Sequence, residues 1–159
     1  MSAGALSIRP ALPADLDTLV SLLATLFSIE EDFIFDELKQ RRGLALMIEN
    51  DRGCVLVAEA EGRVVGMCSG QLLVSTAEGA LSLLVEDVVV DAQWRRRGVG
   101  RLLMETISDW GRVKKVSRLQ LLADRNNKPA LDFYRSLGWQ TTKLISLRTY
   151  LRQCGVGRQ

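Results

Sequence analysis

Two adjacent carboxylates, Glu86 and Asp87, stand out because residues 81–90 contain no other charged side chain. Burial in an apolar run raises the pKa of a carboxyl group toward neutral pH, where it can act as a general base. The chain has no histidine, so carboxylates are its main candidates for that role. Regular strand alternation would place them on opposite faces, with Glu86 on the face of Val88 and Val90. In the alternative interpretation, each carboxylate caps a backbone defect or pairs with an arginine.

A glycine-rich turn follows this run. Arg95, Arg96 and Arg97 precede Gly98 and Gly100, which open a predicted helix. Glycines let backbone N–H groups close on phosphate oxygens, and the helix dipole and the arginines add positive potential. The spacing matches neither the P-loop nor the dinucleotide-binding fingerprint. The turn therefore predicts an anion site, with two alternatives: ordinary turn glycines beside solvated arginines, or a basic patch for nucleic acid.

Composition limits the classes of function. Lysine and arginine number 21 against 19 acidic residues, a balance that argues against a nucleic-acid partner. Cys54, Cys68 and Cys154 lie far apart without CxxC spacing, so we expect no metal site and no disulfide framework. We also expect no leader and no membrane association, because no apolar run approaches about 20 residues. These features together favour the cytoplasm.

Hydrophobic periodicity predicts the elements that position these groups. The first half contains a short strand at 6–9, helices over 16–27 and about 36–49, a hairpin of strands 54–59 and 64–74, and a central strand at 81–90. The second half contains a helix over 99–110 that Gly111 can end, a strand at 117–124, a helix from Pro129 to Gly138, and one or two strands between Trp139 and Leu151. This order predicts one α/β domain over residues 1–152, with a mixed sheet and about four helices. Residues 153–159 are expected to form a flexible tail.

Two motifs in this order resemble the GNAT superfamily of N-acetyltransferases. The first is the Arg-x-x-Gly-x-Gly turn at 95–100, and the second is the Asn-x-x-Ala-x-x-Phe-Tyr pattern at 127–134, followed by Leu-Gly-Trp at 137–139. Either motif alone is weak, whereas the ordered pair is specific. The resemblance implies a GNAT-like fold, in which a mixed, mostly antiparallel sheet contains one parallel strand pair that splays apart.

The resemblance also implies a binding site for acetyl-coenzyme A between the splayed strands 81–90 and 117–123. Backbone groups of Val88 and Val90, with Val89 between them, would hold the pantetheine arm. The pyrophosphate would bind backbone amides of six residues: Arg95, Arg96, Arg97, Gly98, Val99 and Gly100. Asn127 would bind the cosubstrate from the next helix.

The implied reaction is direct transfer of an acetyl group to a primary amine in a ternary complex. Tyr134 would protonate the departing thiolate; its alternative is a core aromatic beside Phe133. The amine must lose a proton before it attacks, and Glu86 is our preferred base, with Asp87 or a water as alternatives. A backbone N–H freed by a bulge near Val88–Val90 would stabilise the oxyanion. No metal is expected.

The acceptor remains open in the sequence. We expect it to be an amine on a small molecule or a protein, chosen by the first two helices and the loop 75–79. Four acidic residues between the first two helices suit a cationic amine, although a solvated acidic connection is the alternative: Glu30, Glu31, Asp32 and Asp36. Residues 86–90 also look like the corresponding strand of glucosamine-6-phosphate N-acetyltransferases, but the substrate half does not obviously match.

Two further possibilities follow from the sequence. The competing class of function is a non-catalytic acyl-coenzyme A sensor that has kept the pyrophosphate turn. An exposed strand within residues 144–151 could also pair across a homodimer. Cys54 and Cys68 lie in β-rich apolar runs, so we expect small core residues there and not acyl carriers.

Overall fold

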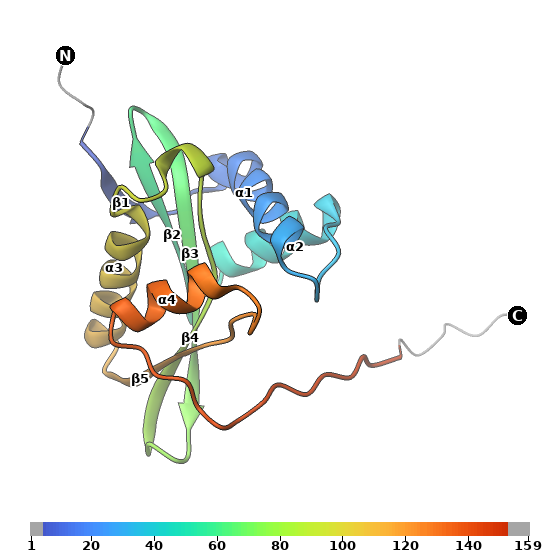
Figure 1. The fold of residues 1–159 in the computed structure, drawn as a ribbon, viewed down its shortest axis with the longest axis vertical. Coiled ribbons are helices and arrows are strands. Elements are labelled where there is room, and N and C mark those ends of the chain that lie inside the picture. The colour runs from blue at the N-terminus through green and yellow to red at the C-terminus, as the bar shows by residue number, and fades with distance from the viewer. Residues whose placement is uncertain (1–4, 153–159) are drawn as a thin grey trace, which may run out of the picture. The chain divides into compact units, whose positions relative to one another are not determined.

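The computed structural model describes residues 5–152, which fall into two compact units, residues 5–124 and 125–152. Each unit is described by itself. The first unit contains five strands and three α-helices in the order β1 (Ser7–Pro10), α1 (Leu16–Ile29), α2 (Glu37–Ile48), β2 (Gly53–Ala60), β3 (Arg63–Ser75), β4 (Ala80–Val90), α3 (Val99–Val113) and β5 (Val116–Leu121) (Figure 1). The second unit contains α4 (Lys128–Ser136). None of the described helices is both long and apolar enough to cross a membrane.

The five strands form one sheet in the order β1-β2-β3-β4-β5. All neighbours are antiparallel except β4 and β5, which run parallel. The β2–β3 hairpin closes through Glu61 and Gly62, whose φ angles of 52° and 72° suit a tight two-residue turn. The predicted α/β fold, with its mixed and mostly antiparallel sheet, is confirmed.

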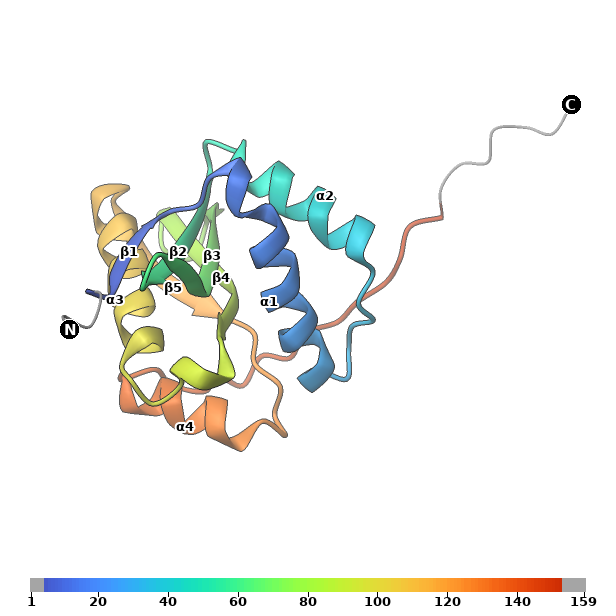
Figure 2. The ribbon, with the colours of Figure 1, turned by 90° about the horizontal axis from the view of Figure 1, so that it is seen from above.

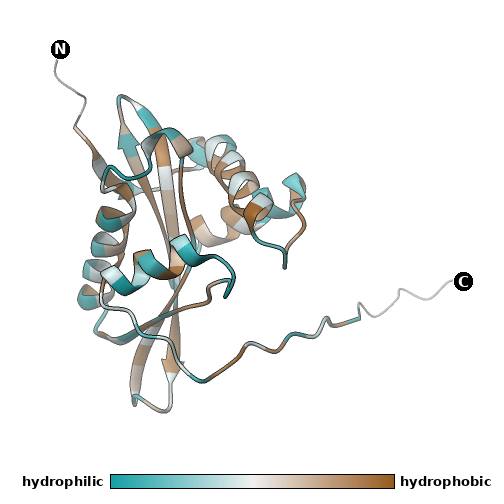
Figure 3. Cartoon of the chain, viewed as in Figure 1, coloured by the Kyte–Doolittle hydropathy of each residue, from teal (hydrophilic) through white to brown (hydrophobic). Residues whose placement is uncertain are grey.

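Helices cover both faces of this sheet in the first unit (Figure 2). The apolar face of α1 packs with α2 against alternate residues of the central strands, including Val57, Met67 and Val89. These central strands are also the most hydrophobic part of the sheet (Figure 3). Packing against α1 therefore holds this face of β4 in place.

Helix α3 covers the opposite face, where glycines permit its close approach. A Cβ atom at Gly70 would lie 2.9 Å from Leu83 Cδ1 and 3.0 Å from Ile107 Cδ1. The prediction that Gly111 ends this helix is wrong, because α3 continues to Val113. A Cβ at Gly111 would lie 3.4 Å from a methyl group of Leu83, so this glycine sits inside the helix against the sheet.

The second unit begins with α4 as predicted, and Asn127 caps it by accepting a hydrogen bond from the Ala130 amide at 3.2 Å. Gly138 follows with a φ of 87°, which suits a glycine just after a helix. The prediction of strands between Trp139 and Leu151 is wrong, because residues 140–152 are extended but belong to no sheet. A strand needs a partner for its backbone, and alternating side chains alone do not supply one. The predicted tail, 153–159, lies outside the described residues.

Candidate active site

Strand β4 loses its parallel neighbour halfway along its length. The β4–β5 ladder ends at the pair Val85 and Leu121, whereas β4 continues to Val90. Within the described residues, no strand pairs with this edge of β4 from Glu86 onward. The edge therefore offers backbone groups to another extended chain.

A β-bulge interrupts the ladder of β4 with β3 at the same level. Met67 pairs with Val89 and Ser69 pairs with Glu86, so two β4 residues, Asp87 and Val88, lie opposite the single residue between Met67 and Ser69. A bulge leaves its extra residue unpaired. Asp87 has a φ of 50°, which costs an L-residue about 1–2 kcal/mol and marks a constrained position. The bulge lies at the start of the segment where we expected it.

The bulge brings both carboxylates to one face of β4. Ser69 is the cross-strand partner of Glu86, and its Oγ donates a hydrogen bond of 3.1 Å to Oδ2 of Asp87. Side chains of a cross-strand pair share a face, so Asp87 turns toward the face of Glu86. The expectation of opposite faces is wrong, because the extra residue breaks the alternation. Glu86 is exposed and Asp87 is partly buried.

These carboxyl groups have perturbed acidities. Desolvation by the surrounding protein raises the pKa of Glu86, even though its side chain reaches solvent, and the neighbouring Asp87 raises the pKa further. Burial also raises the pKa of Asp87, although the hydrogen bond from Ser69 lowers it. A third carboxyl, Glu30 at the end of α1, has its pKa raised by burial and then by the charges of Asp87 and Asp124. Clustered carboxylates of this kind are suited to accept protons and to attract a cation.

The glycine-rich turn leaves the start of α3 open. Gly98 occupies the N-cap position with a φ of 80°, and no side chain caps the helix there. A Cβ atom added at Gly98 would meet nothing within 4 Å. The first-turn amides of a helix lack intrahelical acceptors and lie at the positive end of its dipole. This terminus has the geometry of an anion site.

The arginines of the turn are exposed and differ in their contacts. Arg95 Nε donates to the Val90 carbonyl at 3.2 Å, which holds the turn against the end of β4. The guanidinium of Arg97 lies 5.0 Å from the centre of the Trp94 ring. Arg96 has a φ of 59°, so the chain makes a sharp bend between its two neighbours.

The thiols of the first unit are poor nucleophiles. Cys54 and Cys68 are both buried. Burial raises the pKa of Cys54 to about 11 and that of Cys68 further still. Thiols that stay protonated at neutral pH do not attack thioesters readily. The expectation that they are core residues is supported.

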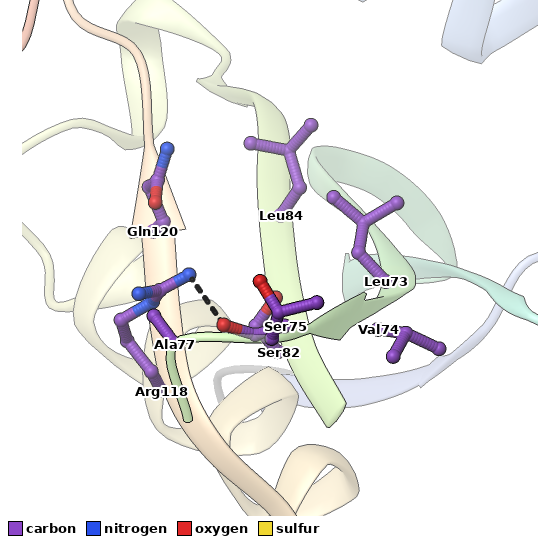
Figure 4. A pocket seen from close by; sticks show the side chains of 9 residues that line it. Leu73, Val74, Ser75, Ala77, Ser82, Leu84, Arg118 and Gln120 are labelled. Carbon is purple, nitrogen blue, oxygen red and sulfur yellow. Dashed lines mark hydrogen bonds between the residues drawn. The ribbon is translucent and has the colours of Figure 1, made fainter. Parts of the chain in front are cut away.

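A cavity of about 320 Å³ opens along β4 before the bulge. Residues of β3, β4, β5 and the β3–β4 loop line it: Leu73, Val74, Ser75, Thr76, Ala77, Ser82, Leu84, Arg118 and Gln120. Figure 4 shows Arg118 pointing to Ser75 across its floor, where Nη2 and Oγ lie 3.4 Å apart. Ser82 and Leu84 share a face of β4 with Glu86. Because Glu86 is two residues beyond Leu84, the cavity lies roughly 7 Å along the strand from it.

The remaining predicted site residues, Asn127 and Tyr134, belong to the second unit. The Tyr134 ring is partly buried between Phe133 and Trp139, with ring centres 5.2 Å and 6.0 Å away. The first unit therefore brings together Glu86, Val88–Val90 and Arg95–Gly100 along one strand and its turn. Sequence reasoning missed Ser69, because no local pattern shows which side chain meets the bulge, and it missed Asp124, whose charge raises the pKa of Glu30.

The first unit is an α/β fold in which the one parallel strand pair separates before the glycine-rich start of α3. A family model described as "Acetyltransferase (GNAT) family" matches residues 17–139. The chain belongs to this family, and the resemblance seen in its sequence is confirmed.

Individual relatives are distant. An uncharacterised N-acetyltransferase of Methanocaldococcus jannaschii is 22% identical over 141 residues, which cover 87% of this chain and 62% of that protein. Among solved structures, a possible acetyltransferase from Clostridium difficile 630 matches with a TM-score of 0.81 and 22% identity, covering 93% of this chain and 99% of its own. An aminoglycoside acetyltransferase from an uncultured soil metagenomic sample, in complex with sisomicin, matches with a TM-score of 0.73 and 22% identity, covering 93% and 97%. The chain spans less than two thirds of the archaeal relative, and these structures share its fold.

Proposed function

We propose that this protein transfers an acetyl group from acetyl-coenzyme A to a primary amine, by direct attack in a ternary complex. One observation carries the proposal: the unpaired edge of β4 leads, through the turn at residues 91–98, to the uncapped start of α3. An extended, polar arm that ends in a pyrophosphate matches both parts, since the edge offers strand-like hydrogen bonds and the helix start offers amides. Acetyl-coenzyme A has this shape and supplies the acetyl thioester.

The groups that would hold the donor follow the chain. Backbone groups of Val88 and Val90 would bind the pantetheine arm, and the amides from Arg95 to Gly100 would bind the pyrophosphate. The open space at Gly98 supports this assignment, because a side chain there would stand beside the phosphate. Asn127 would contribute from the start of α4, where its Oδ1 already caps the helix and its amide nitrogen can donate.

Proton transfer would use the carboxylates at the bulge. Glu86 would accept the proton of the amine, directly or through water, since its raised pKa brings it closer to a useful value. Asp87, oriented by Ser69, would raise that pKa by its negative charge. A backbone N–H freed by the bulge would donate to the developing oxyanion. Tyr134 would donate the proton that the thiolate requires.

We infer that the acceptor is cationic and enters beside these carboxylates. The charge of Asp87 raises the pKa of both Glu30 and Glu86, so negative charge is concentrated near the bulge. The cavity before the bulge opens on the same face of β4 and has the size of a small-molecule site. The aminoglycoside acetyltransferase of like fold supports an amine acceptor. We assign the protein to the cytoplasm from its cysteine content.

The experiment measures how much coenzyme A raises the melting temperature of the wild-type protein and of a variant substituted at Gly98. Coenzyme A should stabilise the wild-type protein, by about 2.7 kcal/mol at a hundredfold excess over its Kd. Gly98→Glu should abolish the shift, because its carboxylate repels phosphate. Gly62→Glu is the matched control, since Gly62 also has a positive φ and open space but lies in the β2–β3 turn. An undiminished shift in Gly98→Glu would place the site elsewhere.

Activity then separates the enzyme from a sensor. Acetyl-coenzyme A should release free thiol in the presence of a cationic amine, with polyamines, lysine peptides and aminoglycosides as the first panel. Tight binding of acetyl-coenzyme A without thiol release across a broad set of amines would favour the sensor and refute catalysis.

A further inference from the structure

The cavity along β4 contains a guanidinium whose hydrogen bonds are incomplete (Figure 4). Arg118 Nη1 donates to Oε1 of Glu78 at 3.3 Å, and Nη2 donates to Oγ of Ser75 at 3.4 Å. Its Nε is buried and finds no acceptor among the residues that the structure describes. A guanidinium has five N–H donors and no acceptor, so an anionic oxygen in the cavity would accept the hydrogen bonds that these two neighbours leave unmade.

The ion pair between Arg118 and Glu78 leaves this positive charge available. The two side chains are 40% and 36% exposed, and the distance between Nη1 and Oε1 is 3.3 Å. Ion pairs that solvent reaches in this way are weak, so another anion can compete with Glu78. Among the described residues that line the cavity, Arg118 alone is charged. The cavity therefore attracts an anion.

Hydroxyl groups beside the guanidinium can donate to the same anion. Ser75 Oγ accepts hydrogen bonds from the Glu78 amide and from Arg118, which leaves its own hydrogen to donate. Ser82 is only 5% exposed and lines the same cavity. A guanidinium together with hydroxyl donors suits a carboxylate or a phosphate. The leucine side chains of the lining, Leu73 and Leu84, add apolar walls.

This cation lies in line with the carboxylates of the bulge. Ser82, Leu84 and Glu86 follow one another on one face of β4, and Arg118 is the β5 partner of Ser82. Ser82 and Leu84 lie roughly 13 Å and 7 Å along the strand from Glu86. The face therefore leads from a positive site, past an apolar residue, to the negative charges at the bulge. All of these residues belong to the first unit.

We propose that the acceptor carries an anionic group, a carboxylate or a phosphate, which Arg118 binds in the cavity while the amine lies at Glu86. The proposal rests on the acetyl transfer proposed above and names the class of acceptor: an amine joined by an apolar chain to an anionic group roughly 7–13 Å away. Arg118 determines specificity and takes no part in proton transfer. Opposite charges at the two ends of the site set the direction in which the acceptor binds.

The test compares matched acceptors in the thiol-release assay. A series of ω-amino acids of increasing chain length is run beside the corresponding ω-amino amides and ω-aminoalkyl phosphates, each with acetyl-coenzyme A. At the best length, kcat/KM of the wild-type protein should be about ten- to a hundredfold higher for a carboxylate or a phosphate than for the amide. The higher of the two anionic values identifies the group. Equal values for acid, phosphate and amide at every length would overturn the proposal and leave acetyl transfer standing.

Substitutions then assign the preference to Arg118. Arg118→Gln should remove it through a higher KM for the anionic acceptors and not through a lower kcat, and coenzyme A should still stabilise this variant. Glu78→Gln should lower that KM, because a competing carboxylate is gone while the guanidinium stays. Arg112→Gln in the exposed last turn of α3 is the control and should match the wild type. A preference that survives Arg118→Gln would overturn the proposal.

Calorimetry tests the anion site without turnover. With coenzyme A bound, the N-acetylated ω-amino acid or its phosphate counterpart should bind the wild-type protein more tightly than the N-acetylated amide does. Arg118→Gln should abolish the difference, and the wild-type comparison alone decides if that variant fails to fold. Absence of thiol release from every amine would count against acetyl transfer, whereas equal affinity for the acid, the phosphate and the amide, or binding of none of them, would overturn the anionic site.

Discussion

At the scale of single residues, the bulge in β4 sets how the two carboxylates are arranged. Asp87 adopts a left-handed backbone and accepts the Ser69 hydroxyl, which places a second negative charge beside Glu86. A carboxylate next to another carboxylate binds a proton more tightly than it would alone. The pKa of Glu86 is therefore raised by desolvation and then further by this backbone irregularity, which brings Asp87 beside it.

Replacing Glu86 with glutamine should slow acetyl transfer most near neutral pH, above the pKa of Glu86 and below that of the amine. The base must be ionised to accept a proton, so wild-type activity should fall as the pH drops through its raised pKa. We expect a loss of about 10²-fold or more near neutrality, shrinking at high pH as free amine accumulates. Cofactor affinity should hardly change. Glu105→Gln on the exposed side of α3 is the control. Equal loss at every pH would contradict a role as base.

Replacing Tyr134 with phenylalanine should separate a catalytic hydroxyl from a packed ring. The contacts of the ring with Phe133 and Trp139 survive the change, so melting temperature and coenzyme A binding should persist. Turnover should drop by about ten- to a thousandfold, with the lower end expected because a thiolate leaves tolerably unaided. A wild-type rate constant in a folded variant would remove Tyr134 from the mechanism.

At the scale of elements, the close packing of α3 against the sheet depends on Gly70. A methyl group there would overlap the buried side chains of Leu83 and Ile107. Gly70→Ala should therefore lower the free energy of unfolding by about 1–3 kcal/mol, measured by urea denaturation. Gly43→Ala is the opposite control, because Gly43 lies inside α2 with open space around its Cα. It should raise stability by about 0.5–1 kcal/mol. If Gly70→Ala were as stable as the wild type or more stable, the side chains of Leu83 and Ile107 would be able to move aside, and the packing of α3 would not depend on Gly70.

The elements also show which features the sequence can predict. Helices α1, α2 and α4 and strands β2–β4 begin and end within about two residues of expectation, because their apolar periods and their turn residues act locally. The sequence predicted a bulge near Val88–Val90 but not the turning of Asp87 toward the face of Glu86, since that depends on the register with β3. The strand expected after Trp139 failed for a related reason: pairing depends on a partner elsewhere in space.

At the scale of the whole molecule, stability should depend on pH through a network that ties β1 to its neighbours. Arg9 forms ion pairs of 2.8 Å with both Asp15 and Glu59. Its hydrogen bond lowers the pKa of Asp15 below the ordinary value. The folded protein therefore binds the Asp15 proton more weakly than the unfolded chain does. The contribution of the Arg9–Asp15 ion pair to the free energy of unfolding is present in full above about pH 4. It is lost as the pH falls through the lowered pKa of Asp15.

The variant Asp15→Asn should accordingly be less stable than the wild type by about 1 kcal/mol at pH 7. The difference should shrink on acidification below about pH 4. Denaturant titrations at several pH values would measure it. Asp17→Asn removes an exposed ion pair with Arg41 and should cost less. A difference in free energy of unfolding between wild type and Asp15→Asn that stays constant down to pH 2 would refute a stabilising role for the Asp15 carboxylate.

Because Cys54 and Cys68 are buried, the rate at which their thiols are labelled can report how often the central strands open. Both thiols lie on neighbouring strands, β2 and β3, and are shielded from solvent. Cys154 lies outside the described residues, so a Cys154→Ser background leaves these two as the only thiols. A maleimide can reach them only when the strands open, and its rate of reaction then reports the opening equilibrium. Ligand occupancy of β4 would appear as slower alkylation, without any acceptor amine or spectroscopic label.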